Sequence, residues 1–377
     1  MNGVGMGFVT KSSNCFAGKR IRIIGKGVAR MPERKSSEVI NIAVDVMGGD
    51  YAPGAIIDGV CMTLERYGNE FKLLLVGDQK RMEVELKRVG ILGDPRLELV
   101  HASQVVEMGD HPVSAVRQKR DSSINVAMNL VRVGRASGVF SAGSTGASVV
   151  SAYFRLSMLP GIERPGIAAV MPSERGNFLL LDAGASVDCA PVNLLHYGIM
   201  GSIYAKSILN KPNPRVGLIC NGTEEGKGNK LTQGALALLH EAKMINFIGN
   251  VEGHDLFSGG VDVAVCDGFV GNVILKSCEQ LAKSMGRLVK KAIMTKLIWK
   301  LGALMAKGAF NELKHQTDFS EIGGAPLLGV NGIVIIGHGI SDGKAVMNGI
   351  RQAGAAVRQK VNETIAEHVR EVSGQQN

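Results

Sequence analysis

A loop of small residues, SAGSTGA at Ser141–Ala147, is the stretch of this chain best suited to chemistry on an anion. A strand that turns into a helix through such residues directs several backbone N–H groups and the positive end of the helix dipole toward one point. Its glycines allow the backbone to approach a ligand closely, and its hydroxyls can donate hydrogen bonds to anionic oxygens. The residues that we predict to bind substrate here are Ser141, Gly143, Ser144, Thr145 and Gly146. The alternative is a tight turn capped by serine or threonine.

The same loop does not match the nucleotide-binding patterns. A P-loop has a lysine directly after its last glycine, whereas Ala147 stands there in this chain. The glycine spacing also differs from that of the dinucleotide-binding fingerprint. The pattern therefore excludes both of these motifs.

Three cationic side chains are candidates for holding the anion. Arg117 and Lys119 precede the loop, and Lys227 lies in a second glycine-rich stretch. Arginine suits bidentate contact with phosphate oxygens, and any of the three could neutralise the charge of a bound anion. We predict that Arg117 and Lys119 bind substrate and that Lys227 acts in catalysis. The alternatives are a solvated helix face for the first two and a simple ion pair with a neighbouring glutamate for Lys227.

Acidic side chains stand at the ends of several expected strands, at Asp45, Asp182, Asp188 and Asp267. One of them could orient a cation or hold a catalytic hydrogen bond, and capping of the next helix or turn is the alternative for each. His338 lies in a Gly-His-Gly turn and could protonate a leaving group, since histidine is the commonest general acid; a structural histidine is the alternative. The predicted catalytic set is Asp182, Lys227, Asp267 and His338.

The elements that must position these residues follow from the apolar pattern. Short apolar segments alternate with segments of helical periodicity, which is typical of βαβ units and a parallel sheet. The expected strands are 40–46, 71–77, 96–100, 138–140, 166–171, 177–181, 215–219, 246–248, 261–265 and 332–336. The expected helices include 52–67, 79–90, 148–158 and 341–370.

Most of these strands end in loops rich in Gly, Asn, Asp and Thr. In open parallel sheets the ligand lies outside the carboxyl ends of the strands, so we expect the loops to converge on one crevice. Further residues of these loops that we predict to bind substrate are Asn221, Thr223, Asn250 and Asn272.

Composition limits the classes of partner. The chain of 377 residues has a net charge of +9, but residues 1–40 hold eight Lys or Arg against two Glu, so most of the excess lies there. We therefore expect no nucleic-acid partner. The six cysteines show no metal-ligand spacing, and we expect neither a metal nor a cofactor. Residues 1–39 are expected to be a basic leader that is disordered or not translated, and residues 40–377 a single catalytic domain.

The segment 281–314 differs from the rest of the chain. Apolar residues recur at helical spacing among lysines and arginines, and the single tryptophan follows in a basic context. This pattern predicts an inserted amphipathic helical hairpin that binds a membrane surface. The expected membrane contacts are Leu297, Ile298, Trp299 and Leu301. A helix pair packed in a dimer interface is the alternative, and a dimerising first half with a tip in lipid would satisfy both.

A series of motifs, in order along the chain, resembles one family. They are IAVDVMGGD (42–50), VHASQVVEM (100–108), AVRQKRDSSI (115–124), SAGSTGA (141–147), LLLDAGASVD (179–188), NGTEEGKGN (221–229), FIGNVEG (247–253), CDGFVGNVILK (266–276) and GGAPLLGVNG (323–332). Together they resemble the bacterial phosphate acyltransferases of phospholipid synthesis, which are acyl-acyl carrier protein:phosphate acyltransferases. The resemblance runs from about residue 40 to 370.

The resemblance implies a Rossmann-like three-layer α/β/α fold with a mostly parallel sheet, related to phosphate acetyltransferases and isocitrate/isopropylmalate-type dehydrogenases. It implies a cytoplasmic homodimer without cofactors that transfers a fatty acyl group from acyl carrier protein to inorganic phosphate. The hairpin would attach the enzyme to the inner face of the membrane, near glycerol-3-phosphate acyltransferase. Two positions depart from the family pattern, since Ser144 and Ser186 stand where asparagine is usual.

The chemistry implied needs no covalent intermediate. Phosphate is a nucleophile at neutral pH and a thiolate is a good leaving group, so the protein must hold phosphate beside the thioester and stabilise the developing oxyanion. Two other classes compete with this hypothesis. A metal-dependent decarboxylating dehydrogenase would need a dinucleotide site and clustered carboxylates, and a non-catalytic scaffold would bind acyl carrier protein without turnover.

Overall fold

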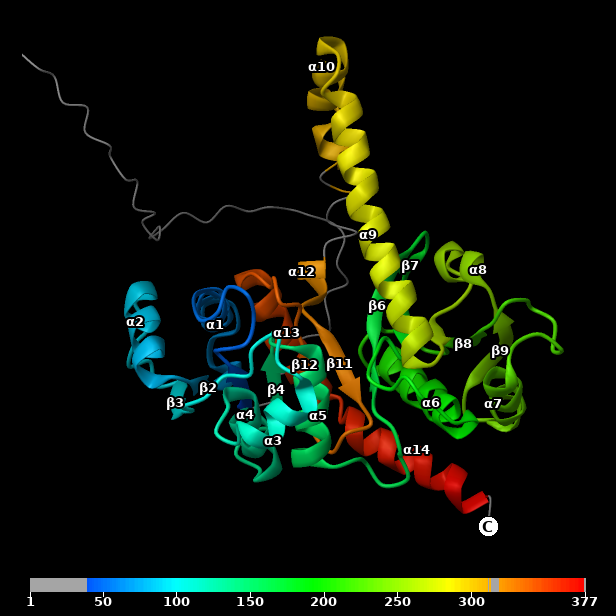
Figure 1. Cartoon of the computed structure of the whole chain (residues 1–377), viewed down its shortest axis with the longest axis horizontal. Coiled ribbons are helices and arrows are strands. Elements are labelled where there is room, and N and C mark those ends of the chain that lie inside the picture. The colour runs from blue at the N-terminus through cyan, green and yellow to red at the C-terminus, as the bar shows by residue number, and fades with distance from the viewer. Residues whose placement is uncertain (1–38, 311, 313–318, 376–377) are drawn as a thin grey trace, which may run out of the picture. The chain divides into compact units, whose positions relative to one another are not determined.

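The strands of the chain form two mostly parallel sheets in the computed structural model, which describes residues 39–310, 312 and 319–375 (Figure 1). The predicted leader lies outside the described residues apart from Val39, and the chain from Val39 onward forms one structural unit. The first sheet has the strand order β3 (Leu97–His101), β2 (Phe71–Gly77), β1 (Ile40–Asp45), β4 (Gly138–Ser141), β12 (Ile333–Ile336), β11 (Ala325–Leu328) and β5 (Gly166–Ile167). The second has the order β6 (Ala169–Ser173), β7 (Gly176–Leu181), β10 (Val263–Val265), β8 (Arg215–Ile219) and β9 (Asn246–Val251).

Helices follow most strands and cover the sheets, as the sequence pattern predicts. Their bounds are α1 (Gly54–Tyr67), α2 (Gln79–Val89), α3 (Pro112–Gln118), α4 (Ser123–Arg132), α5 (Thr145–Leu156), α6 (Pro191–Ser207), α7 (Lys230–Glu241), α8 (Gly253–Ser258), α9 (Gly268–Ile293), α10 (Leu297–Met305), α12 (Phe319–Ile322), α13 (Gly343–Arg358) and α14 (Val361–Gln375). The α/β prediction is thus confirmed, and the parallel strands are divided between two sheets.

The first sheet is buried on both faces. Along β1, Ile42 and Val44 belong to the apolar cluster under α1 and α13, whereas Ala43 belongs to the cluster under α4 and α5. Successive side chains of a strand point to opposite faces, which explains this division and the nearly continuous apolar sequence of the strand. The two helical layers therefore hold β1 and β4 side by side at the centre of the sheet.

The connection between the two sheets departs from the prediction of one strand over 166–171. Gly166–Ile167 pair with β11 in the first sheet, whereas Ala169–Ser173 pair with β7 in the second. Both pairings are antiparallel, and β11 itself was not predicted from the sequence. A single apolar run cannot indicate that its two halves serve different sheets, because both halves are equally buried.

The single helix predicted over 341–370 is wrong. The structure has two helices there, α13 and α14, which are separated by Gln359 and Lys360. Lys360 has φ +51°, in the left-handed region, which ends the helical path of α13. Apolar periodicity continues across the break, and it therefore gave no sign of the change in direction.

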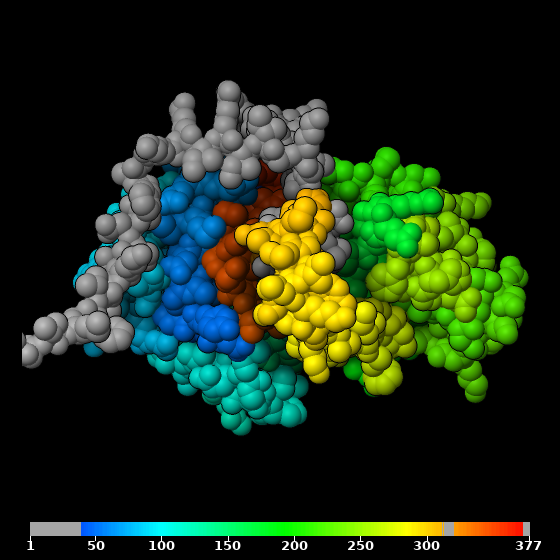
Figure 2. Space-filling model, turned by 90° about the horizontal axis from the view of Figure 1, so that it is seen from above, coloured from blue at the N-terminus to red at the C-terminus, as the bar shows by residue number. Residues whose placement is uncertain are grey.

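Helices α9 and α10 together form a helical arm that extends from the end of β10 (Figure 1). Figure 2 looks down on this arm from its α10 end. Helix α9 begins at Gly268, earlier than the predicted hairpin at 281–314, and runs for 26 residues. Residues 311 and 313–314 of that prediction lie outside the described residues. Among the described helices, none combines the length and the apolar character needed to cross a bilayer.

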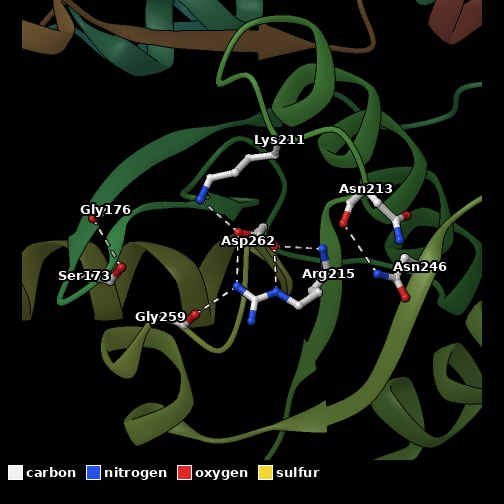
Figure 3. A network of polar contacts seen from close by, with 8 residues as sticks. All are labelled: Ser173, Gly176, Lys211, Asn213, Arg215, Asn246, Gly259 and Asp262. Atoms are coloured by element: carbon white, nitrogen blue, oxygen red, sulfur yellow. Dashed lines mark hydrogen bonds and ion pairs between the residues drawn. The ribbon is translucent and has the colours of Figure 1, made fainter. Parts of the chain in front are cut away.

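A network of polar contacts ties the amino-terminal ends of β8 and β10 together (Figure 3). Asp262 accepts hydrogen bonds from the Nε and the backbone N–H of Arg215, at 2.8 and 3.0 Å, and Lys211 Nζ lies 3.1 Å from its Oδ1. Burial alone would raise the pKa of Asp262, but the hydrogen bonds from Arg215 and Lys211 lower it to about 2. Since this folded-state pKa is depressed, the carboxylate stabilises the fold at neutral pH. The network lies at the edge of the second sheet opposite the strand ends that form the candidate site.

Candidate functional site

The loop Ser141–Ala147, called the glycine loop below, lies at the carboxyl edge of the first sheet beside two other strand ends. Strand register places Ser141 opposite Asp45 of β1 on one side and opposite Ile336 of β12 on the other. The backbone N–H of Gly337 donates to Ser141 O at 2.8 Å, and that of Asp50 donates to Gly339 O at 2.8 Å. The ends of β1, β4 and β12 are therefore hydrogen-bonded to one another at this edge.

Asp45 and Ser141 form a hydrogen-bonded chain that reaches into the glycine loop. Ser141 Oγ donates to Asp45 Oδ2 at 2.7 Å and accepts from the backbone N–H of Gly143 at 3.2 Å. The backbone N–H of Met47 donates to Asp45 Oδ1 at 3.2 Å. Asp45 is 2% exposed, and burial raises the pKa of its carboxyl although hydrogen bonds from Ser123, Ser141 and the backbone lower it.

The amino-terminus of α5 completes the glycine loop. Ser144 caps this helix, and its Oγ accepts from the backbone N–H of Ala147 at 3.4 Å. Thr145 and Gly146 are the first two helical residues, and N–H groups in the first turn have no partner within their own helix. Such N–H groups, together with the positive end of the helix dipole, form an arrangement that can bind an anion.

A small cavity lies between Asp45 and the start of α5. Its volume is about 10 Å³, which is room for roughly one water molecule. The lining residues are Asp45, Gly48, Val105, Val106, Ser123, Ile124, Ser141, Gly143, Ser144, Ala147 and Ser148. Ser148 was not predicted, yet its buried Oγ has no hydrogen-bond partner among the described residues. Its spacing of four residues from Ser144, one turn along the helix, is the sequence signal that could have identified it.

The two predicted cations of the α3 region lie in different settings, and Lys119 is the one in contact with a residue that lines this cavity. Lys119 Nζ donates to Asp110 Oδ2 at 2.5 Å and to the backbone oxygen of Val105, a lining residue, at 2.9 Å. The hydrogen bond from Lys119 lowers the pKa of Asp110. The guanidinium of Arg117 lies over the ring of Phe154 of α5, 5.0 Å from the ring centroid. The α3 region thus brings Lys119 beside the cavity and Arg117 against the last turn of α5.

At the carboxyl edge of the second sheet, Asp182 folds the turn that follows β7. Its carboxylate accepts backbone hydrogen bonds from Ile167, Gly184, Ala185 and Ser186 at 2.7–2.9 Å. Burial raises the pKa of this carboxyl, and the four backbone hydrogen bonds act in the opposite direction. This geometry matches the alternative role for Asp182 in the sequence analysis, which is capping of the turn that follows its strand.

Asp267 and Asn272 lie at the start of α9, against the same turn. Asp267 Oδ1 accepts from the backbone N–H groups of Phe269 and Val270, both at 2.9 Å, which is the geometry of a helix cap. A Cβ atom on Gly184 would lie 3.4 Å from Asn272 Cβ. The structure therefore brings Asp182, Asp267 and Asn272 together.

Ser186, the second position that departs from the family pattern, is buried in that turn. Its Oγ donates to Pro165 O at 2.9 Å. The backbone oxygen of Ser186 accepts from the N–H of Gly268 at 2.9 Å. A short hydroxyl at this position thus ties the turn to the segment that precedes β5.

The remaining predicted residues of the second sheet lie in and beside the β8–α7 loop. Asn221 Oδ1 accepts from the N–H of Gly228 at 2.9 Å, and Asn250 Nδ2 donates to Glu224 O at 3.0 Å. A Cβ on Gly222 would lie 2.7 Å from Cγ of the exposed Lys227. Thr223 and Asn250 line a cavity of about 440 Å³, which shares no lining residue with the cavity at the glycine loop.

His338 lies at the first-sheet edge, in the turn after β12. It is exposed, and its Nδ1 accepts from the N–H of Ile340 at 3.3 Å. The predicted residues thus gather in three places. Around the glycine loop are Lys119, Ser141, Gly143, Ser144, Thr145, Gly146 and His338, while Arg117 lies against the last turn of α5; around the β7 turn are Asp182, Asp267 and Asn272; around the β8–α7 loop are Asn221, Thr223, Lys227 and Asn250.

Comparisons with known proteins identify close relatives. A family model described as "Fatty acid synthesis protein" matches residues 40–364. The chain is 50% identical over 333 residues to the phosphate acyltransferase of Pelotomaculum thermopropionicum, which covers 88% of this chain and 96% of that protein. It is 45% identical over 328 residues to the phosphate acyltransferase of Nitratidesulfovibrio vulgaris strain DP4, which covers 87% of this chain and 94% of that protein.

Solved structures of low sequence identity share the fold. A phosphotransacetylase from Streptococcus pyogenes superimposes with a TM-score of 0.58 at 14% identity, over 85% of this chain and 94% of that chain. The EutD phosphotransacetylase from Staphylococcus aureus superimposes with a TM-score of 0.55 at 16% identity, with the same coverage. At such identities the likeness concerns the fold alone.

Proposed function

The chain belongs to the phosphate acyltransferase family, and from this premise we propose that its glycine loop binds the inorganic phosphate that attacks the acyl donor. The protein is an enzyme that transfers an acyl group to phosphate in phospholipid synthesis. The observation that carries the proposal is the meeting of Asp45, Ser141 and the amino-terminus of α5 around one polar cavity.

The reaction needs position and charge more than a reactive side chain. A phosphate oxygen attacks the thioester carbonyl, the new C–O bond forms, and the C–S bond breaks as the thiolate leaves and takes up a proton. N–H groups of Thr145 and Gly146 and the hydroxyl of Ser144 hold the phosphate oxygens. The phosphate ion fills a larger space than this cavity, so in this proposal it binds outside the cavity, at the exposed Thr145 at the start of α5.

The other predicted residues take supporting roles in this proposal. Lys119, which contacts Val105 at the cavity, neutralises the negative charge of phosphate, and the exposed His338 protonates the leaving thiolate. Lys227 lies at the β8–α7 loop, where it assists binding of the acyl donor. Asp182 and Asp267 shape the β7 turn and the start of α9 through their backbone hydrogen bonds. The side-chain amides of that region and of the β8–α7 loop contact the acyl donor: Asn221, Asn250 and Asn272, together with the hydroxyl of Thr223.

The donor proposed is the acyl thioester of acyl carrier protein. Acyl carrier proteins are acidic, and a basic rim speeds the association of an acidic partner. Exposed arginines on and after α3 supply such a rim: Arg117 and Arg120. The proposed product, a long-chain acyl phosphate, would then pass to glycerol-3-phosphate acyltransferase at the inner face of the membrane.

The experiment that tests the function is an assay of the purified protein with palmitoyl-(acyl carrier protein) and inorganic phosphate. Hydroxylamine traps acyl phosphate as a hydroxamate, and we expect hydroxamate formation that depends on phosphate. A reaction without added phosphate is the control for direct attack of hydroxylamine on the thioester. No phosphate-dependent hydroxamate would overturn the proposal, and binding of the carrier protein without turnover would favour a scaffold instead.

The helical arm is proposed to attach the enzyme to a membrane surface through its tip, while α9 packs in a homodimer. In α10, Leu297 is 75% exposed, Ile298 is 72% exposed and Met305 is 90% exposed. Lys296 Nζ lies 4.6 Å from the centroid of the Trp299 ring, so a cation and an aromatic ring stand together at the tip. Exposed apolar residues beside basic ones are typical of helices that lie in the interface of an anionic bilayer.

We expect the triple change Leu297→Ser, Ile298→Ser and Trp299→Ser to weaken binding to anionic phospholipid vesicles by more than about 100-fold, because three apolar side chains lose their burial. Activity on a soluble acyl donor should stay within about twofold of the parent, because the tip lies outside the catalytic loops. Vesicle co-sedimentation and the hydroxamate assay measure the two effects.

A matched triple change on α9 separates the two parts of the arm. Leu281, Met285 and Leu288 are also exposed apolar residues at helical spacing, and we expect their replacement by serine to shift the dimer toward monomer while vesicle binding persists. Sedimentation velocity measures the oligomeric state. Loss of activity with unchanged vesicle binding in the tip variant would contradict the membrane role and place the tip in the catalytic dimer.

A further inference from the structure

We propose that Asp45 is a positioning residue that fixes the hydroxyl of Ser141 and, through it, the part of the glycine loop that binds phosphate. This inference rests on the proposed function of that loop. Asp45 lies on β1, 96 residues before Ser141 in sequence, and its role is visible only in the register of the central strands.

The direction of the Ser141 hydroxyl follows from the contacts on either side of it. Ser141 Oγ donates to Asp45 Oδ2 at 2.7 Å, so its hydroxyl hydrogen points toward the carboxyl. A lone pair of Ser141 Oγ is then free to accept the N–H of Gly143 at 3.2 Å. The chain Asp45–Ser141–Gly143 thereby holds the first residues of the loop and leaves the N–H groups of Thr145 and Gly146 for a ligand.

The surroundings allow little freedom to rearrange. A Cβ on Gly48 would lie 2.7 Å from both Asp45 Oδ2 and the backbone N of Gly143. A Cβ on Gly143 would lie 3.3 Å from Ser141 Oγ. The carboxylate, the hydroxyl and two glycine backbones are therefore in mutual contact at the wall of the cavity.

Burial of the Asp45 carboxyl lowers the stability of the folded state at neutral pH. Burial raises the pKa of Asp45, so the folded state favours the neutral acid and the group costs stability as the pH rises above its ordinary value. Any negative charge that this carboxyl carries also repels phosphate. A residue that weakens the fold and opposes the ligand is best explained by its effect on Ser141.

Asp45→Asn removes the charge and keeps the shape. The amide would donate to Ser141 Oγ, and the hydroxyl hydrogen would turn away from residue 45. We expect the dissociation constant of inorganic phosphate, measured by isothermal titration calorimetry, to rise about tenfold, with a similar rise in KM for phosphate and an unchanged KM for the acyl donor. Thermal stability at pH 7 should equal or exceed that of the parent.

Changes at Ser141 provide the matched controls. Ser141→Ala should weaken phosphate binding about as much as Asp45→Asn, and Ser141→Thr, which keeps the hydroxyl, should bind nearly as the parent does. The double variant Asp45→Asn, Ser141→Ala should also lose only about tenfold, because both changes break the same chain of hydrogen bonds. If the double variant instead loses about 100-fold in phosphate affinity, the product of the two single effects, the inference is overturned.

Two further outcomes separate this inference from the function it rests on. If the parent binds phosphate and Asp45→Asn binds it equally or more tightly, Asp45 does not position the loop, and the proposed function stands. If the parent itself binds no phosphate and forms no phosphate-dependent hydroxamate, the proposed function fails and this inference fails with it.

Discussion

The variant Gly48→Ala is expected to lose acyl phosphate formation by about 100-fold or more while it remains folded. Its new Cβ would lie 2.7 Å from Asp45 Oδ2 and 2.7 Å from the backbone N of Gly143. Gly143 N belongs to the backbone, and Asp45 Oδ2 belongs to a buried side chain held by Ser141, so the β1 end and the glycine loop must move apart. A displacement near 1 Å in a site that works by positioning costs about 100-fold in rate.

The hydroxamate assay with saturating acyl donor measures this loss, and circular dichroism verifies the fold. We expect a stability loss of about 1–3 kcal/mol from overpacking, which leaves the protein folded at 25 °C. Gly253→Ala is the matched control, since no atom lies within 4 Å of a Cβ at that position. Parent-like activity of Gly48→Ala would show that the close approach of β1 and β4 is not needed for catalysis.

A second glycine, Gly271 in the first turn of α9, is expected to determine whether the chain folds at all. A Cβ there would lie 1.9 Å from the backbone oxygen of Asp182 and 2.9 Å from its carbonyl carbon. The helical arm would have to move away from the β7 turn, and the cap contacts of Asp267 and the contact of Gly268 with Ser186 would be lost with it. We expect Gly271→Ala to lose more than about 4 kcal/mol in the free energy of unfolding, or to be recovered only as aggregate.

Urea unfolding, followed by circular dichroism, measures the effect. Gly286→Ala is the control on the same helix, because no atom lies within 4 Å of a Cβ there and the residue is exposed. Alanine favours helix over glycine, so this control should gain up to about 1 kcal/mol. If both variants unfold at the same urea concentration as the parent, α9 does not pack on the Asp182 turn as described.

The resemblance to phosphate acyltransferases is confirmed by the family model and by curated relatives over most of the chain. The α/β class is confirmed as well, because apolar runs of strand length and helical periodicity follow directly from which faces are buried. The helix predicted over 341–370 is wrong for a physical reason. Apolar spacing reports which side of a segment is buried and does not report a single left-handed residue such as Lys360.

The roles of the site residues stay predictions, and the structure adds the hydrogen-bond partners of each of their side chains that it describes as bonded. Asp182 and Asp267 were chosen for their carboxylates, and both accept hydrogen bonds from nearby backbone N–H groups. Ser148 was not chosen; its spacing of four residues from Ser144 places it on the same side of the helix, but that spacing alone does not show that its hydroxyl faces a polar cavity. Sequence patterns identify which residue types stand at strand ends, but not where each side chain points.

The sequence by itself determined the family, the α/β class and the glycine loop, because each depends on residue types and on spacing within one segment. The tertiary structure alone decided which strand ends meet. It joined Asp45 to Ser141 across 96 residues and placed the two halves of 166–173 in different sheets. Strand order and register arise from packing between distant segments, where many pairings bury similar apolar area, and no local pattern distinguishes among them.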